Sequence, residues 1–189
     1  MLDEGSGSLH ARGVRTEMKS IGILITCSFL SLLPSVSQGQ SRRHLSAPRA
    51  LLEILDKEDR DCVVTNGGLS KSVHVQPIQL AADHSRQILV RGSGLCLCGA
   101  QNCLFWIYRK IGNHDELLLK GAGSTKVRAG QKSAKGYRDV ISESHASAME
   151  TILRTYRYDG SQYQLERCVN RAYYDDNGKH TTKPTYRPC

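Results

Sequence analysis

The chain has 189 residues, seven of them cysteine, and a formal net charge of +8 at pH 7. A basic chain can bind nucleic acid, but its Lys and Arg residues are scattered and form no recognisable nucleic-acid module. The composition therefore argues against a nucleic-acid partner and favours contact with anionic glycans or an acidic protein.

An apolar run at residues 21–33 follows Met18 and precedes small residues that end at Gly39. This pattern is typical of a secretory signal peptide, and a run of about thirteen residues is too short for a membrane-spanning helix. We predict that residues 1–39 are an N-terminal extension and signal peptide, with the true start at Met18. The protein is then secreted or periplasmic, without a stable membrane anchor. An uncleaved signal anchor and lipoprotein processing at Cys27 are the weaker alternatives.

Cleavage after Gly39 leaves 189 − 39 = 150 residues, a length that suits one domain. We expect residues 40–45 to be disordered and residues 46–189 to form a single globular β-rich domain. The six remaining cysteines are an even set, which suits an oxidising compartment.

One helix is predicted at the start of this domain. Ser46 can cap it, Pro48 fits its first turn, and an apolar stripe follows at residues 50–55. The helix should end near residues 57–60 and cover one face of a sheet.

The rest of the chain is a series of short apolar pieces separated by turn residues, which predicts strands. The strand candidates are residues 62–64, 73–78, 87–91, 104–110, 116–120, 125–129, 137–142, 151–158 and 162–168. Residues 131–136 are predicted as a polar, basic loop, and the tail at 173–189 is rich in turn formers. The predicted fold class is mainly β (α+β), a single antiparallel sheet-rich domain with one N-terminal helix.

Two strand-hairpin pieces resemble each other. Residues 106–112 align with residues 154–160 at an offset of 156 − 108 = 48, and residues 88–93 roughly match residues 139–144. This similarity predicts an internal duplication of stacked meanders, because two copies cannot close a propeller. Chance similarity between strands is the alternative.

The cysteines are predicted to staple this fold with disulfides. Six cysteines allow fifteen pairings, of which we favour Cys98–Cys103, Cys62–Cys96 and Cys168–Cys189. Zinc binding by the cysteine cluster and a redox-active disulfide are weaker alternatives, because the spacing fits neither. We expect no metal and no cofactor.

Tyrosines that precede arginines are the candidate binding residues, because both residue types are enriched at binding hot spots. The predicted binding residues are Tyr137, Arg138, Tyr156, Arg157, Tyr108 and Arg109. The alternative is that these tyrosines simply fill strands.

A hydrolase is the alternative function. His145 lies near Asp139 and Ser144 in the sequence, so these three residues are the candidate catalytic set. Sequence neighbours on a strand mostly point to opposite faces, and no nucleophile elbow is present. Catalysis is therefore the weaker prediction.

Two segments carry a family resemblance: the cysteine loop at residues 94–99 with Cys103, and the pair of segments at 136–139 and 156–163. Together they resemble a group of small uncharacterised secreted bacterial proteins over about residues 85–170. The resemblance implies a bacterial envelope or extracellular setting and no particular activity. The second segment is also similar to an integrin-type propeller repeat, but the calcium-binding aspartates of that repeat are absent. We predict a non-enzymatic binding or inhibitory module that recognises a protein or anionic glycan of the cell envelope.

Overall fold

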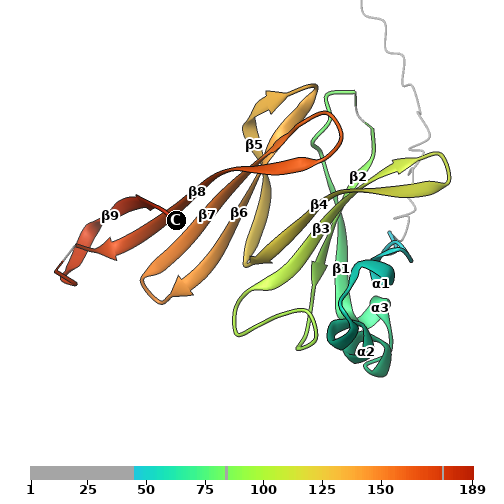
Figure 1. Cartoon of the computed structure of the whole chain (residues 1–189), viewed down its shortest axis with the longest axis horizontal. Helices are drawn as coiled ribbons and strands as arrows, with labels where there is room; N and C mark the ends of the chain where they lie inside the picture. Colours follow the sequence, from blue (N-terminus) through green and yellow to red (C-terminus); the bar gives the residue numbers. More distant parts are fainter. Residues whose placement is uncertain (1–44, 84, 176) are drawn as a thin grey trace, which may run out of the picture. The chain divides into compact units, whose positions relative to one another are not determined.

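Nine strands form two antiparallel sheets in the computed structural model, which describes residues 45–83, 85–175 and 177–189. The strands are β1 (Val73–Ile78), β2 (Gln87–Gly92), β3 (Cys103–Ile111), β4 (His114–Ser124), β5 (Lys126–Ala134), β6 (Tyr137–Ser147), β7 (Glu150–Tyr158), β8 (Tyr163–Tyr174) and β9 (His180–Pro188). The first sheet has the order β1-β2-β3-β4 and the second the order β5-β6-β7-β8-β9, so both are meanders (Figure 1). The predicted mainly β, antiparallel fold class is confirmed.

The described residues all belong to one compact unit, Arg42–Cys189. The predicted signal peptide and residues 40–44 lie outside the described residues. Within the described part of the chain, no helix is long and apolar enough to cross a membrane.

Three short helices replace the single predicted one: α1 (Leu51–Ile54), α2 (Lys57–Thr65) and α3 (Leu69–Ser72). The predicted helix is interrupted because Leu55 is extended and Asp56 starts a new helix, where its side chain accepts a hydrogen bond of 3.0 Å from the Asp59 backbone N–H. Residues 62–64, predicted as a strand, belong to α2.

The other strand candidates each fall within a strand of the structure or overlap one, and two segments predicted as loop or turns also prove to be strands. Residues 131–134, predicted as a loop, continue β5, and the turn is confined to Lys135 and Gly136, which both have positive φ. The tail, predicted as turns, contains the edge strand β9. Pro77 lies in β1, which is an edge strand of the first sheet. An edge strand tolerates proline because one side of its backbone needs no hydrogen-bond donor.

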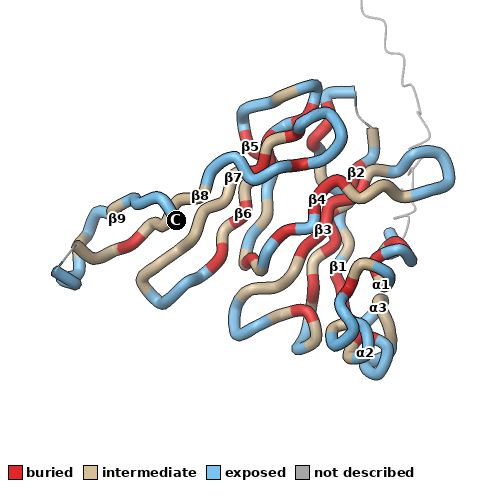
Figure 2. The backbone as a smooth tube through the Cα atoms, viewed as in Figure 1, coloured by how far each residue is buried: buried red, intermediate tan, exposed pale blue. Residues whose placement is uncertain are grey.

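The first sheet is covered on both faces. One core cluster joins the helices to the face that carries Trp106 and Tyr108, and a second joins the opposite face, through Phe105 and Ile107, to the second sheet. Figure 2 shows the resulting concentration of buried residues in β2, β3 and β4. The opposite face of the second sheet has no covering layer among the described residues.

The second sheet repeats the register of the first. The β3–β4 hairpin pairs Tyr108 with Leu117, and the β7–β8 hairpin pairs Tyr156 with Leu165, so both partners are displaced by 48 positions (156 − 108 and 165 − 117). Each hairpin also has a bulge directly before its tyrosine. The structure therefore supports duplication rather than chance similarity between strands.

The strands ahead of the hairpins match as well. Val90 pairs with Trp106 and Ser142 pairs with Arg154, which makes Val90 equivalent to Ser142 at a displacement of 142 − 90 = 52. The sequence alignment of residues 88–93 with 139–144 is one residue out of this register. Such a shift would turn every side chain to the other face of the sheet.

Three disulfides join the cysteines in the pairing that we favoured from the sequence: Cys62–Cys96, Cys98–Cys103 and Cys168–Cys189. The first ties α2 to the loop after β2, the second closes a short loop ahead of β3, and the third ties the end of the chain to β8. Each staple therefore fixes a segment at the margin of a sheet.

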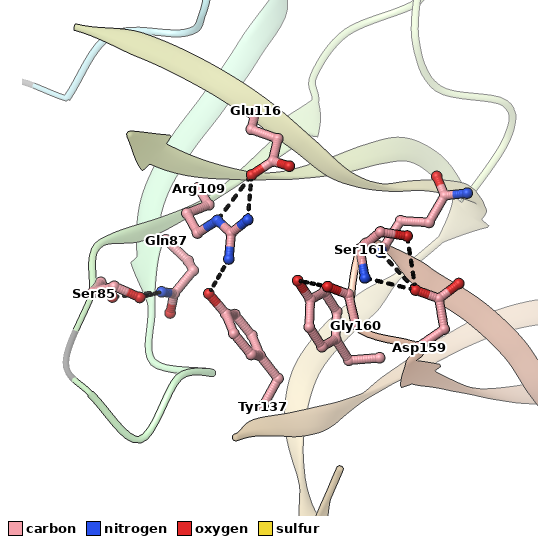
Figure 3. Close-up of polar contacts among 10 residues, drawn as sticks. Ser85, Gln87, Arg109, Glu116, Tyr137, Asp159, Gly160 and Ser161 are labelled. Carbon is pink, nitrogen blue, oxygen red and sulfur yellow. Dashed lines mark hydrogen bonds and ion pairs between the residues drawn. The ribbon is translucent and has the colours of Figure 1, made fainter. Parts of the chain in front are cut away.

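The turn of the β7–β8 hairpin is fixed by the Asp159 carboxylate. It accepts hydrogen bonds from the backbone N–H groups of Ser161 (2.8 Å) and Gln162 (2.9 Å) (Figure 3). It accepts a third from the Gln164 side chain (3.1 Å). These hydrogen bonds lower the pKa of Asp159, and the hydrogen bond from the Gln162 backbone N–H has the largest effect.

Asp159→Asn is therefore expected to lower the free energy of unfolding at neutral pH. The folded-state pKa lies below the unfolded value, so the full stabilisation by the charge is present above the ordinary carboxyl pKa, and it is lost as the pH falls from that value through the lower folded-state pKa. Urea unfolding at several pH values should show the difference between the two proteins shrinking toward low pH. A difference that is constant with pH would contradict this role of the charge.

Candidate functional site

An open pocket of about 600 Å³ lies on the uncovered face of the second sheet, which we call the outer face. The strand register places Arg128, Ile141, Thr155 and Arg167 in one row across β5, β6, β7 and β8 of this face. All four line the pocket. The pocket thus lies on a sheet surface that adjacent strands hold in position.

A bulge in β5 shapes one wall. Between two regular parts of the β5–β6 ladder, residues 130–132 lie opposite the single residue Asp139. The backbone of β5 packs closely against Asp139 at Gly130, where an added Cβ would lie 3.1 Å from the Asp139 Cβ. The Gly130 carbonyl also accepts a 2.7 Å hydrogen bond from Arg138. Bulges commonly re-aim a side chain beside a binding site, and this one brings Lys132 to the pocket.

The lining is rich in charge and mostly positive. Four cations, Arg128, Lys132, Arg157 and Arg167, face two carboxylates, those of Asp139 and Glu166. The formal charge of the lining is therefore 4 − 2 = +2.

Both carboxylates are already paired with one arginine. Arg157 lies 3.4 Å from each oxygen of Asp139 and forms an ion pair with Glu166. The side chain of Asp139 is only 4% exposed, so its charge is shielded from solvent by the arginine. The hydrogen bond with Asp139 is the main cause that raises the pKa of Arg157.

The remaining cations are open to an incoming ligand. Lys132 and Arg167 are exposed, and neither forms an ion pair with a carboxylate among the described residues. Arg128 has one long contact, 3.9 Å, with Glu143. An anionic group in the pocket would meet these side chains without displacing a close ion pair.

The predicted binding tyrosines lie in the core. Tyr108, Tyr137 and Tyr156 are 2%, 7% and 6% exposed, and each belongs to a core cluster. Side chains at this exposure offer almost no surface to a partner. Their burial favours the alternative, that these tyrosines fill strands.

Arg109 joins the two sheets. Its guanidinium donates to the Tyr137 hydroxyl (2.8 Å) and, through Nε (2.9 Å) and Nη2 (2.5 Å), to Glu116 (Figure 3). Glu116 is on β4 of the first sheet and Tyr137 is on β6 of the second. Arg109 and Tyr137, two predicted binding residues, are thus brought together as a structural contact. Of the six predicted residues, Arg157 lines the pocket.

The candidate catalytic residues are not brought together. Asp139 and His145 are 145 − 139 = 6 positions apart on the same strand, about 20 Å at 3.3 Å per residue. The Asp139 carboxylate is held by Arg157, and the Ser144 hydroxyl accepts a 2.7 Å hydrogen bond from Arg154. These three side chains have no common reaction centre.

His145 is instead a docking point for the cysteine loop. The Asn102 side chain accepts a hydrogen bond from the His145 N–H (2.9 Å) and donates one to its carbonyl (2.8 Å). Asn102 lies inside the loop closed by Cys98 and Cys103. Among the described residues, no three His, Cys, Asp or Glu side chains are placed to hold a metal ion.

No protein-family model, curated protein or solved structure matches this chain.

Four charged residues of the site were not predicted from the sequence as site residues: Arg128, Lys132, Glu166 and Arg167. One signal was available: Lys126, Arg128 and Lys132 are all even-numbered, and alternate residues of a strand share a face. The prediction of a loop at residues 131–136 concealed that alternation.

Proposed function

We propose that this protein is a non-enzymatic binding module, secreted or periplasmic, that binds an anionic group of an envelope glycan or protein partner in the outer-face pocket. The observation that carries this proposal is the unequal pairing of the pocket charges. Arg157 pairs with both lining carboxylates, which leaves Lys132 and Arg167 without an ion pair among the described residues and open to a ligand. Charged hydrogen bonds to Arg and Lys are among the stronger polar contacts in binding sites.

The cysteines support a location outside the cytoplasm. All six cysteines downstream of residue 39 are paired in disulfides, and such bonds persist mainly in oxidising compartments. The signal-like apolar run at residues 21–33 points the same way.

Reversal of the two open cations tests the pocket. We expect Lys132→Glu combined with Arg167→Glu to weaken binding to an immobilised polyanion at least tenfold, because each charged hydrogen bond contributes about 1.5–3 kcal/mol. Polygalacturonate and polyglutamate serve as anionic probes, and dextran serves as the uncharged one. Binding of the unmodified protein should also fall as the ionic strength rises.

The matched control is Arg49→Glu combined with Lys57→Glu. These exposed residues lie outside the pocket, and the control changes the net charge by the same amount. If both double variants lose affinity equally, net charge rather than the pocket governs binding. Equal binding of dextran and the polyanions would also exclude the proposed function.

A further inference from the structure

The outer face continues well beyond the pocket. Four positions along β8 from Arg167, the register forms another row that joins Thr151, Arg171 and Tyr186 across β7, β8 and β9. No register shift separates the two rows on β8. Arg171 and Tyr186 therefore point to the same side of the sheet as the pocket cations.

This second row ends in an aromatic ring. Tyr186 is 59% exposed, the most exposed of the large aromatic side chains in the described residues. Beside it, the cross-strand neighbour Arg171 places a positive charge, and an anionic ligand group would complement that charge.

The two rows are separated by an apolar strip. Leu153 pairs with Val169, which pairs with Pro188, and these three side chains share the outer face. Arg167 and Arg171 are about 13 Å apart along β8, and β5 to β9 span about 19 Å. The face thus presents positive groups in both rows. The apolar strip lies between the rows, and the exposed ring of Tyr186 lies beside Arg171.

The duplication explains why this face is open. The pair Leu153–Val169 is equivalent, at 48 positions, to Phe105–Gly121, which the second sheet buries. Leu119, buried in that same contact, is equivalent to Arg167 (167 − 119 = 48). At the second copy, the charged Arg167 thus stands where the first copy has the buried Leu119, while Leu153 and Val169 remain apolar.

We propose that the whole outer face, from the pocket to Tyr186, binds an acidic polysaccharide whose repeating carboxylates meet the pocket cations at one end and Arg171 at the other. This proposal rests on the proposed function, since the pocket is one end of the surface. Carboxylates complement Arg167, Lys132 and Arg171, while the sugar rings contact the apolar strip and stack on Tyr186.

A polysaccharide fits this face better than an acidic peptide does. Extended peptides usually add to the edge of a sheet, where unpaired backbone groups receive them. On the outer face the backbone groups of β6, β7 and β8 are used by neighbouring strands on both sides, so a peptide backbone would find few partners. Sugar hydroxyls can instead pair with side chains such as Thr151 and Thr155.

Tyr186→Ala tests the extended surface in the full-length oxidised protein. We expect its affinity for polygalacturonate to fall about tenfold, because an exposed aromatic anchor is lost. Tyr186→Phe keeps the ring and should bind nearly as the unmodified protein does. Leu95→Ala, which removes a side chain 97% exposed on the cysteine loop, is the control for a general loss of exposed apolar surface.

The remaining outcomes separate the two proposals. Monomeric galacturonate can reach only the pocket, so Tyr186→Ala should leave its binding unchanged while the double reversal of Lys132 and Arg167 abolishes it. Unchanged polymer affinity of Tyr186→Ala, or equal affinity for polyglutamate and polygalacturonate of matched charge, would overturn the extended glycan site and leave the pocket standing. Failure of all anionic probes to bind would overturn the pocket as well.

Discussion

Gly121→Ala is expected to destabilise the protein by about 3 kcal/mol or more, a larger effect than most single methyl additions produce. Gly121 is the cross-strand partner of Phe105, and an alanine Cβ there would lie 1.9 Å from the ring. The ring cannot easily move aside, because Phe105 is fully buried between the sheets and packs edge-on against Tyr156 at 6.4 Å. The overlap must therefore separate the sheets or displace β4.

Urea unfolding followed by tryptophan fluorescence measures this effect, since Trp106 is the single tryptophan and lies in the core. Gly99→Ala is the control, because its added Cβ would lie 3.9 Å from the nearest atom, an ordinary van der Waals contact. Equal stability of the two variants would contradict the packing of Phe105 on Gly121.

Local patterns were sufficient to predict most strands and their turns. Gly112 and Gly160, both with positive φ in the structure, end the two equivalent hairpin strands, and the apolar residues before them mark those strands. The Cys98–Cys103 pairing is local as well, with a sequence separation of 5. These features depend on residues close in sequence.

The candidate site could not be predicted in the same way, because it depends on which face each residue takes. In the dipeptide Tyr156-Arg157, the tyrosine enters the core and the arginine lines the pocket. Successive residues of a strand point to opposite faces, so the Tyr-Arg pairs could never present both side chains to one ligand. The choice between the two faces is made by the first sheet, which covers one of them.

The strand β9 shows the same limit. Its residues are exposed or half-buried throughout, and Figure 2 shows no buried position in it. Lys183 and Pro184 are typical of edge strands, which lack the apolar alternation that identifies interior ones. Its pairing with β8 and the disulfide at its end define it as a strand, and neither can be seen in the apolar pattern of its own residues.

The disulfide at the end of β9 leads to the second large effect. Cys168→Ser combined with Cys189→Ser removes a cross-link with a sequence separation of 21, which the chain-entropy model values at about 3 kcal/mol. Because β9 pairs only with β8 and buries little apolar surface, we expect β9 to separate locally before the sheets unfold. Its backbone amides should then lose protection from hydrogen exchange, while those of β3 and β7 keep theirs.

Separation of β9 should also weaken the proposed ligand site, because Tyr186 is on that strand. The variant should bind polygalacturonate as weakly as Tyr186→Ala does, yet bind monomeric galacturonate normally, since the pocket-lining residues all precede β9. Cys98→Ser combined with Cys103→Ser opens a loop ahead of β3 and is the matched control. It should leave β9 protection and polymer binding unchanged. Retained protection of β9 without Cys168–Cys189 would show that strand pairing alone holds it, and the ring of Tyr186 would then remain in place without the staple.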